Sequence, residues 1–125
     1  MTKTTKVFVY GTLKKGNRIR GLDTLDATAR LVGEAVTVDP EFKLFDLGAF
    51  PAVQFGGSKQ IKGEVWEVSI DTLKNELDAI EGYPTFYTRD MIETTAGGAW
   101  MYHIKDLTEY QAIELEAEHV IAEWN

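Results

Sequence analysis

Glu81 is the residue in this sequence whose type and position best suit proton-transfer chemistry. It follows Leu77 by four residues in a segment with helical spacing, so on a helix it lies on the flank of the apolar face. It also falls in the last turn, where the helix dipole disfavours a carboxylate. Partial burial and the dipole both favour a raised pKa for Glu81, which suits a general acid or base. An exposed glutamate at a helix end explains the position equally well.

A second candidate site is the turn after the first apolar run, Val9-Tyr10-Gly11-Thr12-Leu13. A glycine lets the backbone approach a ligand closely, and consecutive N–H groups in such a turn form an anion-binding nest. Gly11 and Gly16 have the spacing of a phosphate loop, but Asn17-Arg18 replaces the Lys and Ser/Thr that such a loop needs. We therefore exclude a nucleotide-binding loop. An ordinary strand-ending turn is the alternative.

The segment from Glu81 to Arg89 combines an acid, a cation and three aromatic residues. Arg89 could bind a substrate carboxylate through two parallel hydrogen bonds, or pair with Glu81 or another acid. The histidines, His103 and His119, lack the spacing of metal ligands, and the chain contains no cysteine. The sequence therefore predicts no metal site and excludes thiol catalysis.

These residues must be positioned by short strands. Strands are predicted where apolar and polar residues alternate between turn residues. The predicted strands are residues 6–10, 41–47, 51–55, 61–68, 89–94 and 99–104. The last two should form a hairpin around Gly97-Gly98. Within 61–68 the alternation slips, which indicates a bulge or a strand end that is buried on both faces.

Helical spacing supports one helix near Glu81 and one at the C-terminus. The first begins with Asp71 as its N-cap and ends at Gly82, because Pro84 prevents its continuation. The second covers residues 106–125, with an apolar stripe along one side. Residues 22–31 could form a further short helix.

Together these elements predict an α+β fold, with a mixed or largely antiparallel, barrel-like sheet and flanking helices. The length of 125 residues fits a single domain over residues 1–125, with residues 1–5 as a flexible tail.

Charge and composition narrow the classes of partner. The formal net charge of −7 argues against binding to nucleic acid. Residues 1–20 nevertheless carry six cations and no acid, which suits a small anionic group or simply a solvated edge. The N-terminal residues lack the apolar run of a secretory signal, and no stretch has the length of a membrane span. We expect a cytoplasmic protein without a membrane partner.

Segments along most of the chain resemble the gamma-glutamylcyclotransferase-like family, particularly its short gamma-glutamylamine cyclotransferase branch. The matching segments occur in the family's order from residue 6 to about residue 102. They are Val7-Phe8-Val9-Tyr10-Gly11-Thr12-Leu13-Lys14-Lys15-Gly16, Gly63-Glu64-Val65-Trp66-Glu67-Val68, Leu77-Asp78-x-x-Glu81, Glu81-x2-Pro84-x2-Tyr87-x-Arg89 and Ala99-Trp100-Met101-Tyr102. The first segment alone is moderately specific, whereas the ordered set is strong.

The resemblance implies a compact domain whose substrate cavity is capped by the turn after Val9. It implies that Glu81 is the catalytic carboxylate. The residues that it assigns to substrate binding are Tyr10, Gly11, Thr12 and Leu13, followed by Tyr87 and Arg89 from the trailing pattern.

The implied reaction is attack of the free α-amine of a gamma-glutamyl compound on its own γ-carbonyl, which gives 5-oxoproline and a free amine. This transferase- or lyase-type chemistry requires Glu81 as base and then acid, and it needs no metal or organic cofactor. The expected partner is a small gamma-glutamyl molecule. Two alternatives stay open: a non-catalytic binding module for an amino-acid-like ligand, and removal of a gamma-glutamyl group from a biosynthetic product.

Overall fold

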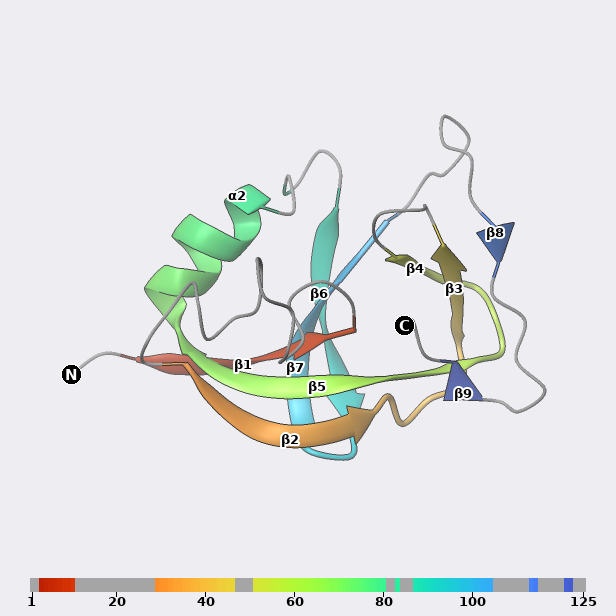
Figure 1. Cartoon of the computed structure of the whole chain (residues 1–125), viewed down its shortest axis with the longest axis horizontal. Coiled ribbons are helices and arrows are strands. Elements are labelled where there is room, and N and C mark those ends of the chain that lie inside the picture. The colour runs from red at the N-terminus through yellow and green to blue at the C-terminus, as the bar shows by residue number, and fades with distance from the viewer. Residues whose placement is uncertain are drawn as a thin grey trace.

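The computed structural model describes residues 3–10, 29–46, 51–80, 83, 87–104, 113–114 and 121–122. Within these ranges strands predominate (Figure 1). The strands are β1 (Thr4–Val9), β2 (Arg30–Val36), β3 (Phe42–Asp46), β4 (Pro51–Phe55), β5 (Gln60–Ser69), β6 (Thr88–Thr94), β7 (Gly97–His103), β8 (Ile113–Glu114) and β9 (Ile121–Ala122). Between β5 and β6 lies a helical segment made of a π-helix, η1 (Thr72–Leu77), and a short α-helix, α2 (Asp78–Ile80).

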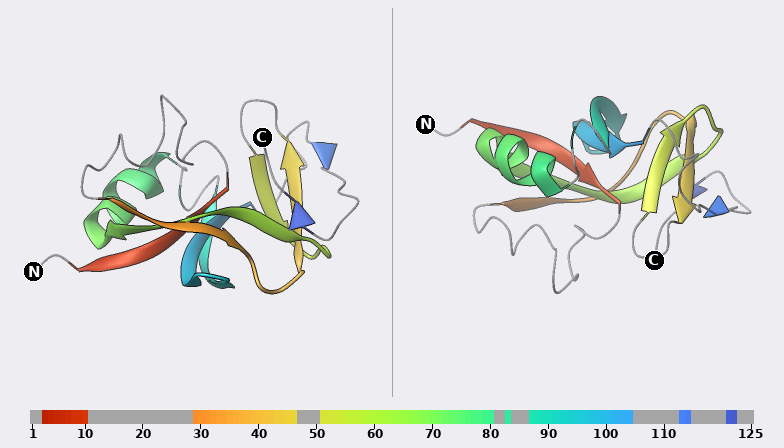
Figure 2. Two further views of the ribbon diagram at one scale, coloured as in Figure 1. Left: turned by 60° about the horizontal axis from the view of Figure 1, so that its bottom comes forward. Right: turned by 90° about the horizontal axis from the view of Figure 1, so that it is seen from above.

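The strands form two sheets. The larger sheet has the order β2-β5-β1-β7-β6, and β9 pairs with β5 beside this path. The smaller sheet has the order β4-β3-β8. All pairings are antiparallel except those of β1 with β7 and of β5 with β9. The helical segment lies at one end of β5 and the smaller sheet at the other (Figures 1 and 2). The predicted α+β fold with a mostly antiparallel sheet is confirmed.

The outer strands of the larger sheet approach each other at one end only. Thr37, just after β2, forms an antiparallel bridge with Thr94 at the end of β6. The N–H of Thr95 donates to the carbonyl of Val36 (2.9 Å), and the N–H of Val38 donates to the carbonyl of Glu93 (3.0 Å). Among the described strands this contact does not extend into a closed barrel, so "barrel-like" holds only for this end.

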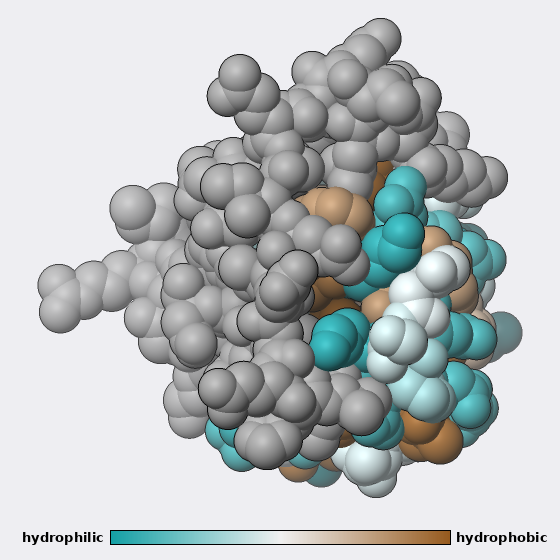
Figure 3. Space-filling view, turned by 90° about the vertical axis from the view of Figure 1, so that its right-hand side faces the viewer, coloured by the Kyte–Doolittle hydropathy of each residue, from teal (hydrophilic) through white to brown (hydrophobic). Residues whose placement is uncertain are grey.

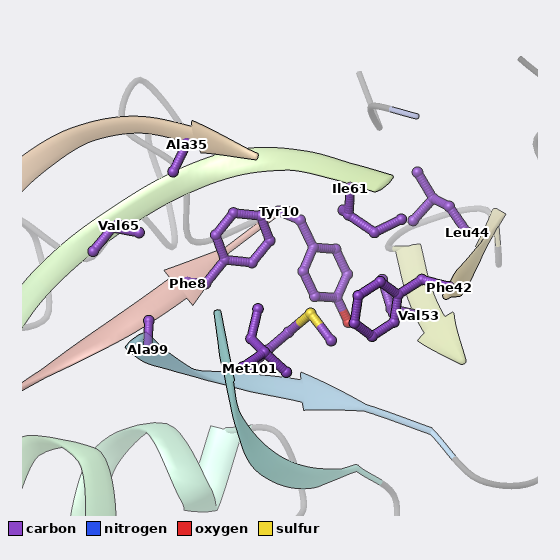
Figure 4. Packing of buried hydrophobic residues seen from close by; sticks show 11 residues of the cluster. Phe8, Tyr10, Ala35, Phe42, Leu44, Val53, Ile61, Val65, Ala99 and Met101 are labelled. Carbon is purple, nitrogen blue, oxygen red and sulfur yellow. The ribbon is translucent and has the colours of Figure 1, made fainter. Parts of the chain in front are cut away.

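β1 is buried on both faces and separates two apolar clusters. Val7 and Val9 face the helical segment and pack in one cluster with Leu73 and Leu77. On the other face, the side chains of Phe8 and Tyr10 point into a cluster between the two sheets. Figure 4 shows this second cluster, to which strands of both sheets contribute. The end of β1 is therefore held from both sides.

Close backbone approach explains one glycine of the matched segments. A Cβ atom on Gly63 would lie 2.3 Å from the carbonyl oxygen of Val9 and 2.9 Å from the Phe8 ring. Only glycine lets β5 approach the end of β1 this closely. Further along β5, Val65 and Trp66 are both buried, on opposite faces. The slip in alternation thus reflects burial on both faces, and the bulge lies in β2 between Leu31 and Gly33.

The predicted hairpin of β6 and β7 is confirmed, with its two-residue turn at Thr95-Ala96 rather than at Gly97-Gly98. Gly97 begins β7 with a φ of +101°, a conformation that favours glycine.

Three predictions about the termini and the helices need correction. Thr4 and Thr5 pair with β5, so the expected flexible tail does not include them. Arg30 and Leu31 begin β2, so the short helix over 22–31 is wrong at its end; residues 22–28 lie outside the described residues. At the start of η1, Asp71 makes no capping hydrogen bond.

Ser69 is the residue that caps the helical segment. Its hydroxyl oxygen accepts the N–H of Thr72 at 3.0 Å, as an N-cap side chain does. The last residues of β5 therefore lead directly into the helix.

The C-terminal helix predicted over 106–125 is wrong at the residues that the structure describes. Ile113 and Glu114 form β8 on the edge of β3, and Ile121 and Ala122 form β9 beside β5. Both pairs use backbone groups at strand positions that local spacing cannot reveal, since an apolar stripe at helical spacing contains no information about a distant sheet edge.

The surface of the described part shows no large apolar area in the view of Figure 3, where hydrophilic and hydrophobic side chains alternate. The larger exposed apolar residues belong to separate elements, Val32, Val38, Phe55, Tyr83 and Met91. Within the described ranges, no helix has the length and hydropathy to cross a membrane.

Candidate active site

The helical segment places Asp78 beside strands β6 and β7 of the larger sheet. Leu73 and Leu77 are buried against the β1 face, which fixes the rotation of the segment. The N–H of Asp78 donates to the carbonyl of Leu73, the i to i+5 pattern of a π-helix. Such π turns occur often at functional sites, because they redirect the residues that follow.

The carboxylate of Asp78 is buried and receives three hydrogen bonds. Arg89 donates from Nε to Oδ1 at 2.8 Å and from Nη2 to Oδ2 at 3.1 Å. The hydroxyl of Tyr102 donates to Oδ1 at 2.5 Å. The side chains of Arg89 and Asp78 are each only 12% exposed. A buried charge is tolerated when it is paired and hydrogen-bonded in this way.

The guanidinium of Arg89 also lies over two aromatic rings. Its central carbon is 4.8 Å from the centre of the Tyr83 ring and 4.6 Å from that of Trp100. The hydrogen bonds to Asp78 are the largest cause of a raised pKa for Arg89, partly offset by burial. Arg89 is therefore a fixed positive charge in this site.

Tyr102 joins the end of β1 to the end of the helical segment. Its carbonyl oxygen accepts the Tyr10 hydroxyl at 2.6 Å, while its own hydroxyl binds Asp78. Tyr10 and Tyr102 are 7% and 4% exposed, so these bonds are sheltered from competing water. Tyr102 thus binds Tyr10, which begins the predicted substrate-binding turn, and Asp78, which lies three residues before the predicted catalytic residue Glu81.

A backbone hydrogen bond joins Asp78 to Tyr83, described residues on the two sides of Glu81 in the sequence. The N–H of Tyr83 donates to the carbonyl of Asp78 at 2.9 Å. This i to i+5 bond is the one that ends a helix in a Schellman motif, whose glycine precedes the donor residue. Gly82 occupies that place in the sequence. Glu81 and Gly82 lie outside the described residues, so the helix end at Gly82 stays a prediction.

The structure places three of the seven predicted site residues. Glu81, Gly11, Thr12 and Leu13 lie outside the described residues. Tyr10 and Arg89 both contact the Tyr102 region, since Arg89 is also the cross-strand partner of Tyr102.

Tyr87 lies in the apolar cluster that also contains Tyr102, Leu73 and Leu77. Its hydroxyl donates to the carbonyl of Pro51 at 2.6 Å, so it fastens β4 to this side of the molecule. The polar ends of Tyr10, Tyr87 and Arg89 thus bind protein atoms. Their role as direct substrate ligands stays a prediction.

Two residues of this site were missed by sequence reasoning. Asp78 and Tyr102 appear in the matched segments, but nothing in the pattern assigned them a role. The argument applied to Glu81, that a carboxylate near the C-terminal end of a helix is disfavoured by the dipole, applies equally to Asp78 and could have identified it. Tyr102 carries no such local signal, because its partners are 24 and 92 residues away.

His103 is buried and contacts Asp90 and Phe55. It is 3% exposed, its Nε2 lies 2.6 Å from Oδ2 of Asp90, and its ring packs edge-on against Phe55. Among the described residues, no group of three or more His, Asp or Glu side chains is arranged to hold a metal ion.

Sequence comparison identifies relatives of this chain. The model of the family described as "Gamma-glutamyl cyclotransferase, AIG2-like" matches residues 7–124. A Vibrio cholerae protein named "Putative gamma-glutamylcyclotransferase" is 43% identical over 96 residues, which cover 77% of this chain and 78% of that protein. YtfP of Escherichia coli, named a gamma-glutamylcyclotransferase family protein, is 35% identical over 99 residues, which cover 78% of this chain and 80% of YtfP.

Solved structures agree with these matches. The solution structure of Escherichia coli YtfP has a TM-score of 0.61 at 33% identity, covering 87% of this chain and 91% of YtfP. The crystal structure of an AIG2-like protein from mouse has a TM-score of 0.67 at 26% identity, covering 80% of this chain and 76% of the mouse protein. The resemblance found in the sequence is confirmed, and the chain belongs to the gamma-glutamyl cyclotransferase, AIG2-like family.

Proposed function

We propose that this protein is a gamma-glutamylcyclotransferase that acts on a small gamma-glutamyl amine, with Glu81 as its catalytic acid/base. The convergence on Tyr102 is the observation that carries this proposal. Because Tyr10 and Asp78 both bind Tyr102, the chain enters the predicted substrate-binding turn and the predicted catalytic segment from neighbouring points. Family membership supports the same class of reaction.

The reaction joins two atoms of one substrate. The α-amine nitrogen attacks the γ-carbonyl carbon, and the bond from that carbon to the leaving nitrogen then breaks. The ring that forms is 5-oxoproline, and the other product is a free amine. Because both reacting groups belong to one molecule, proper orientation can supply about 7–11 kcal/mol of the barrier reduction.

Proton transfer is the task left to the protein. The α-ammonium group first loses one proton to solvent, which frees the lone pair of the attacking amine. Glu81 takes a second proton from this nitrogen as it bonds to the γ-carbon and then donates a proton to the leaving nitrogen, so the carboxylate returns to its starting state. A positioned acid/base of this kind contributes about 10²- to 10⁴-fold in rate. No metal ion or organic cofactor is required by these steps.

The turn after Tyr10 is the proposed binding site for the glutamyl group. The side chain of Tyr10 is committed to the apolar cluster and to the Tyr102 carbonyl. We therefore assign binding to main-chain groups of residues 10–13, where Gly11 allows close approach. Their N–H groups would hold the substrate carboxylate or the oxyanion that develops on the γ-carbonyl.

The test is a product assay with a panel of gamma-glutamyl amines and dipeptides, including a gamma-glutamyl-lysine isopeptide. Purified wild-type protein should release 5-oxoproline from at least one compound, detected by mass spectrometry. Glu81→Gln should lower that rate by about 10² or more. Glu76→Gln is the matched control, because Glu76 is exposed on the same helical segment, and it should keep the wild-type rate.

Two results would overturn the proposal. A Glu81→Gln variant with the wild-type rate would remove the assigned role of Glu81. Folded wild-type protein that releases no 5-oxoproline from any compound would instead favour a binding function, and release of glutamate would indicate hydrolysis.

A further inference from the structure

We infer that Arg89 is a positioning residue that holds the segment containing Glu81 at both ends, and that it does not itself bind the substrate. The inference rests on the proposed function for the role of Glu81. It departs from the sequence prediction, which placed Arg89 among the substrate-binding residues.

The segment in question runs from Asp78 to Tyr83. Its first residue ends the π-helical turn, and its last residue donates its N–H to the carbonyl of the first. Only four residues lie between them in the sequence, and Glu81 is one of these. Fixing Asp78 and Tyr83 therefore limits where the Glu81 backbone can lie, since a chain of so few residues has little reach.

One guanidinium contacts both of these end residues. Its edge binds the two carboxylate oxygens of Asp78 at 2.8 and 3.1 Å. Its central carbon lies over the ring of Tyr83, 4.8 Å from the ring centre. A planar guanidinium can make an edge contact and a face contact at once, which a lysine ammonium cannot do.

The remaining surroundings of Arg89 fix its own position. Trp100 on β7 stacks against the guanidinium at 4.6 Å, and Tyr102 on the same strand binds the carboxylate that Arg89 binds. Arg89 is itself anchored in β6 opposite Tyr102. The sheet thus provides a rigid base, and Arg89 transmits its position to the segment.

These contacts leave little of Arg89 for a substrate carboxylate. Asp78 occupies the Nε and Nη2 edge of the guanidinium, one of the two edges that can form parallel bonds to a carboxylate, and the rings of Tyr83 and Trp100 lie within 4.8 Å of its central carbon. The side chain is 12% exposed. A substrate carboxylate would have to reach the second edge, formed by Nη1 and Nη2, of this largely buried side chain.

Kinetics separate a positioning role from a binding role. Arg89→Lys keeps the charge but loses the paired hydrogen bonds and the planar stack. Misplacing a catalytic group by about 1 Å can cost about 100-fold, so we expect kcat to fall by about 10- to 100-fold with KM changed by less than about threefold. A direct substrate ligand would instead raise KM as its main effect. Arg30→Lys, at the exposed pair with Glu67, should change neither value.

Amide hydrogen exchange provides a second measurement that does not depend on activity. In Arg89→Lys, the N–H of Tyr83 should exchange at least about tenfold faster than in wild type, because its bond to Asp78 loses support. The N–H of Lys59, bonded to the carbonyl of Phe42 at 2.9 Å in another part of the fold, should keep its rate and so show that the variant is folded.

The two measurements distinguish the possible failures. If wild type makes no 5-oxoproline, the proposed function fails, while exchange at Tyr83 still decides whether Arg89 holds the segment. A Tyr83 exchange rate that is unchanged overturns the inference in either case. A rise in KM with unchanged kcat overturns it as well and returns Arg89 to the substrate-binding residues.

Discussion

Two arginine–carboxylate pairs, one on the larger sheet and one between this sheet and the helical segment, differ in burial and in the number of their contacts. Arg30 on β2 and Glu67 on β5 are cross-strand partners joined by a single contact of 3.2 Å, with side chains that are 70% and 32% exposed. Arg89 and Asp78 share two hydrogen bonds and are each 12% exposed. The Arg89–Asp78 pair has further partners. Tyr102 donates to the carboxylate of Asp78, and the rings of Tyr83 and Trp100 contact the guanidinium of Arg89.

The difference shows that burial determines how much an ion pair contributes to stability. Exposed pairs gain little, because water screens the charges and two long side chains lose freedom. In a buried pair, removing either member strongly lowers the stability of the fold, because the other member is left as an uncompensated charge away from water. We therefore expect the two pairs to respond very differently to the same kind of substitution.

Removing Asp78 should have the largest effect. Asp78→Ala leaves the buried guanidinium of Arg89 without its partner and the Tyr102 hydroxyl without its acceptor. We expect the free energy of unfolding to fall by about 3–5 kcal/mol, measured by urea denaturation. A loss below about 1 kcal/mol would mean that water or another acid compensates the charge and that the pair resembles the exposed one.

Removing the hydroxyl of Tyr102 should have an intermediate effect. Tyr102→Phe preserves the ring in the apolar cluster and deletes one of the three donors to Asp78. A hydrogen bond to a charged group contributes about 1.5–3 kcal/mol, which we expect as the loss in unfolding free energy. Tyr87→Phe is a suitable comparison, because it removes a buried hydroxyl that binds a neutral carbonyl, and its loss should be smaller.

Removing the exposed pair should have a small effect. Arg30→Gln should change the free energy of unfolding by about 1 kcal/mol or less, and added salt should abolish most of that change. A loss as large as that of Asp78→Ala would contradict the comparison on which this account depends.

Raising the pH should leave the contribution of the buried pair unchanged. Asp78 raises the pKa of Arg89 above its ordinary value, so the stabilisation is fully present below the pKa of the unfolded chain and is lost only above that of the folded protein. Both of these pKa values lie far above neutral pH. The difference in unfolding free energy between wild type and Arg89→Gln should therefore be constant from pH 7 to pH 10, and a decline in that range would contradict the assignment.

Much of the fold followed from local sequence patterns. The strands around Val7, Leu44, Val53, Val65 and Ile92 were predicted because alternation and turn residues act over a few positions. The C-terminal pairings of Ile113 and Ile121 were not predictable in this way. Their partners are strands β3 and β5, which are remote in sequence, and an apolar stripe is compatible with a helix as well as with short strands.

The candidate site also contains some residues with local sequence signals and others whose roles depend on long-range contacts. Glu81 and the glycine turn have local signals, namely a carboxylate at a helix end and a glycine after a strand. The network that supports them consists of contacts between residues 11 to 92 positions apart, such as Asp78 with Arg89 and Tyr10 with Tyr102. Sequence reasoning placed Arg89 at the site but could not tell a substrate ligand from a partner of Asp78, because only the fold shows which acid occupies its edge.

The most direct test of this account is a double-mutant cycle on kcat/KM with wild type, Arg89→Lys, Glu81→Gln and the double variant. If Arg89 acts by positioning Glu81, its substitution has nothing left to disturb once Glu81 is replaced, and the double variant should match Glu81→Gln alone. If the two losses multiply in the double variant, Arg89 contributes independently of Glu81 and the account is contradicted.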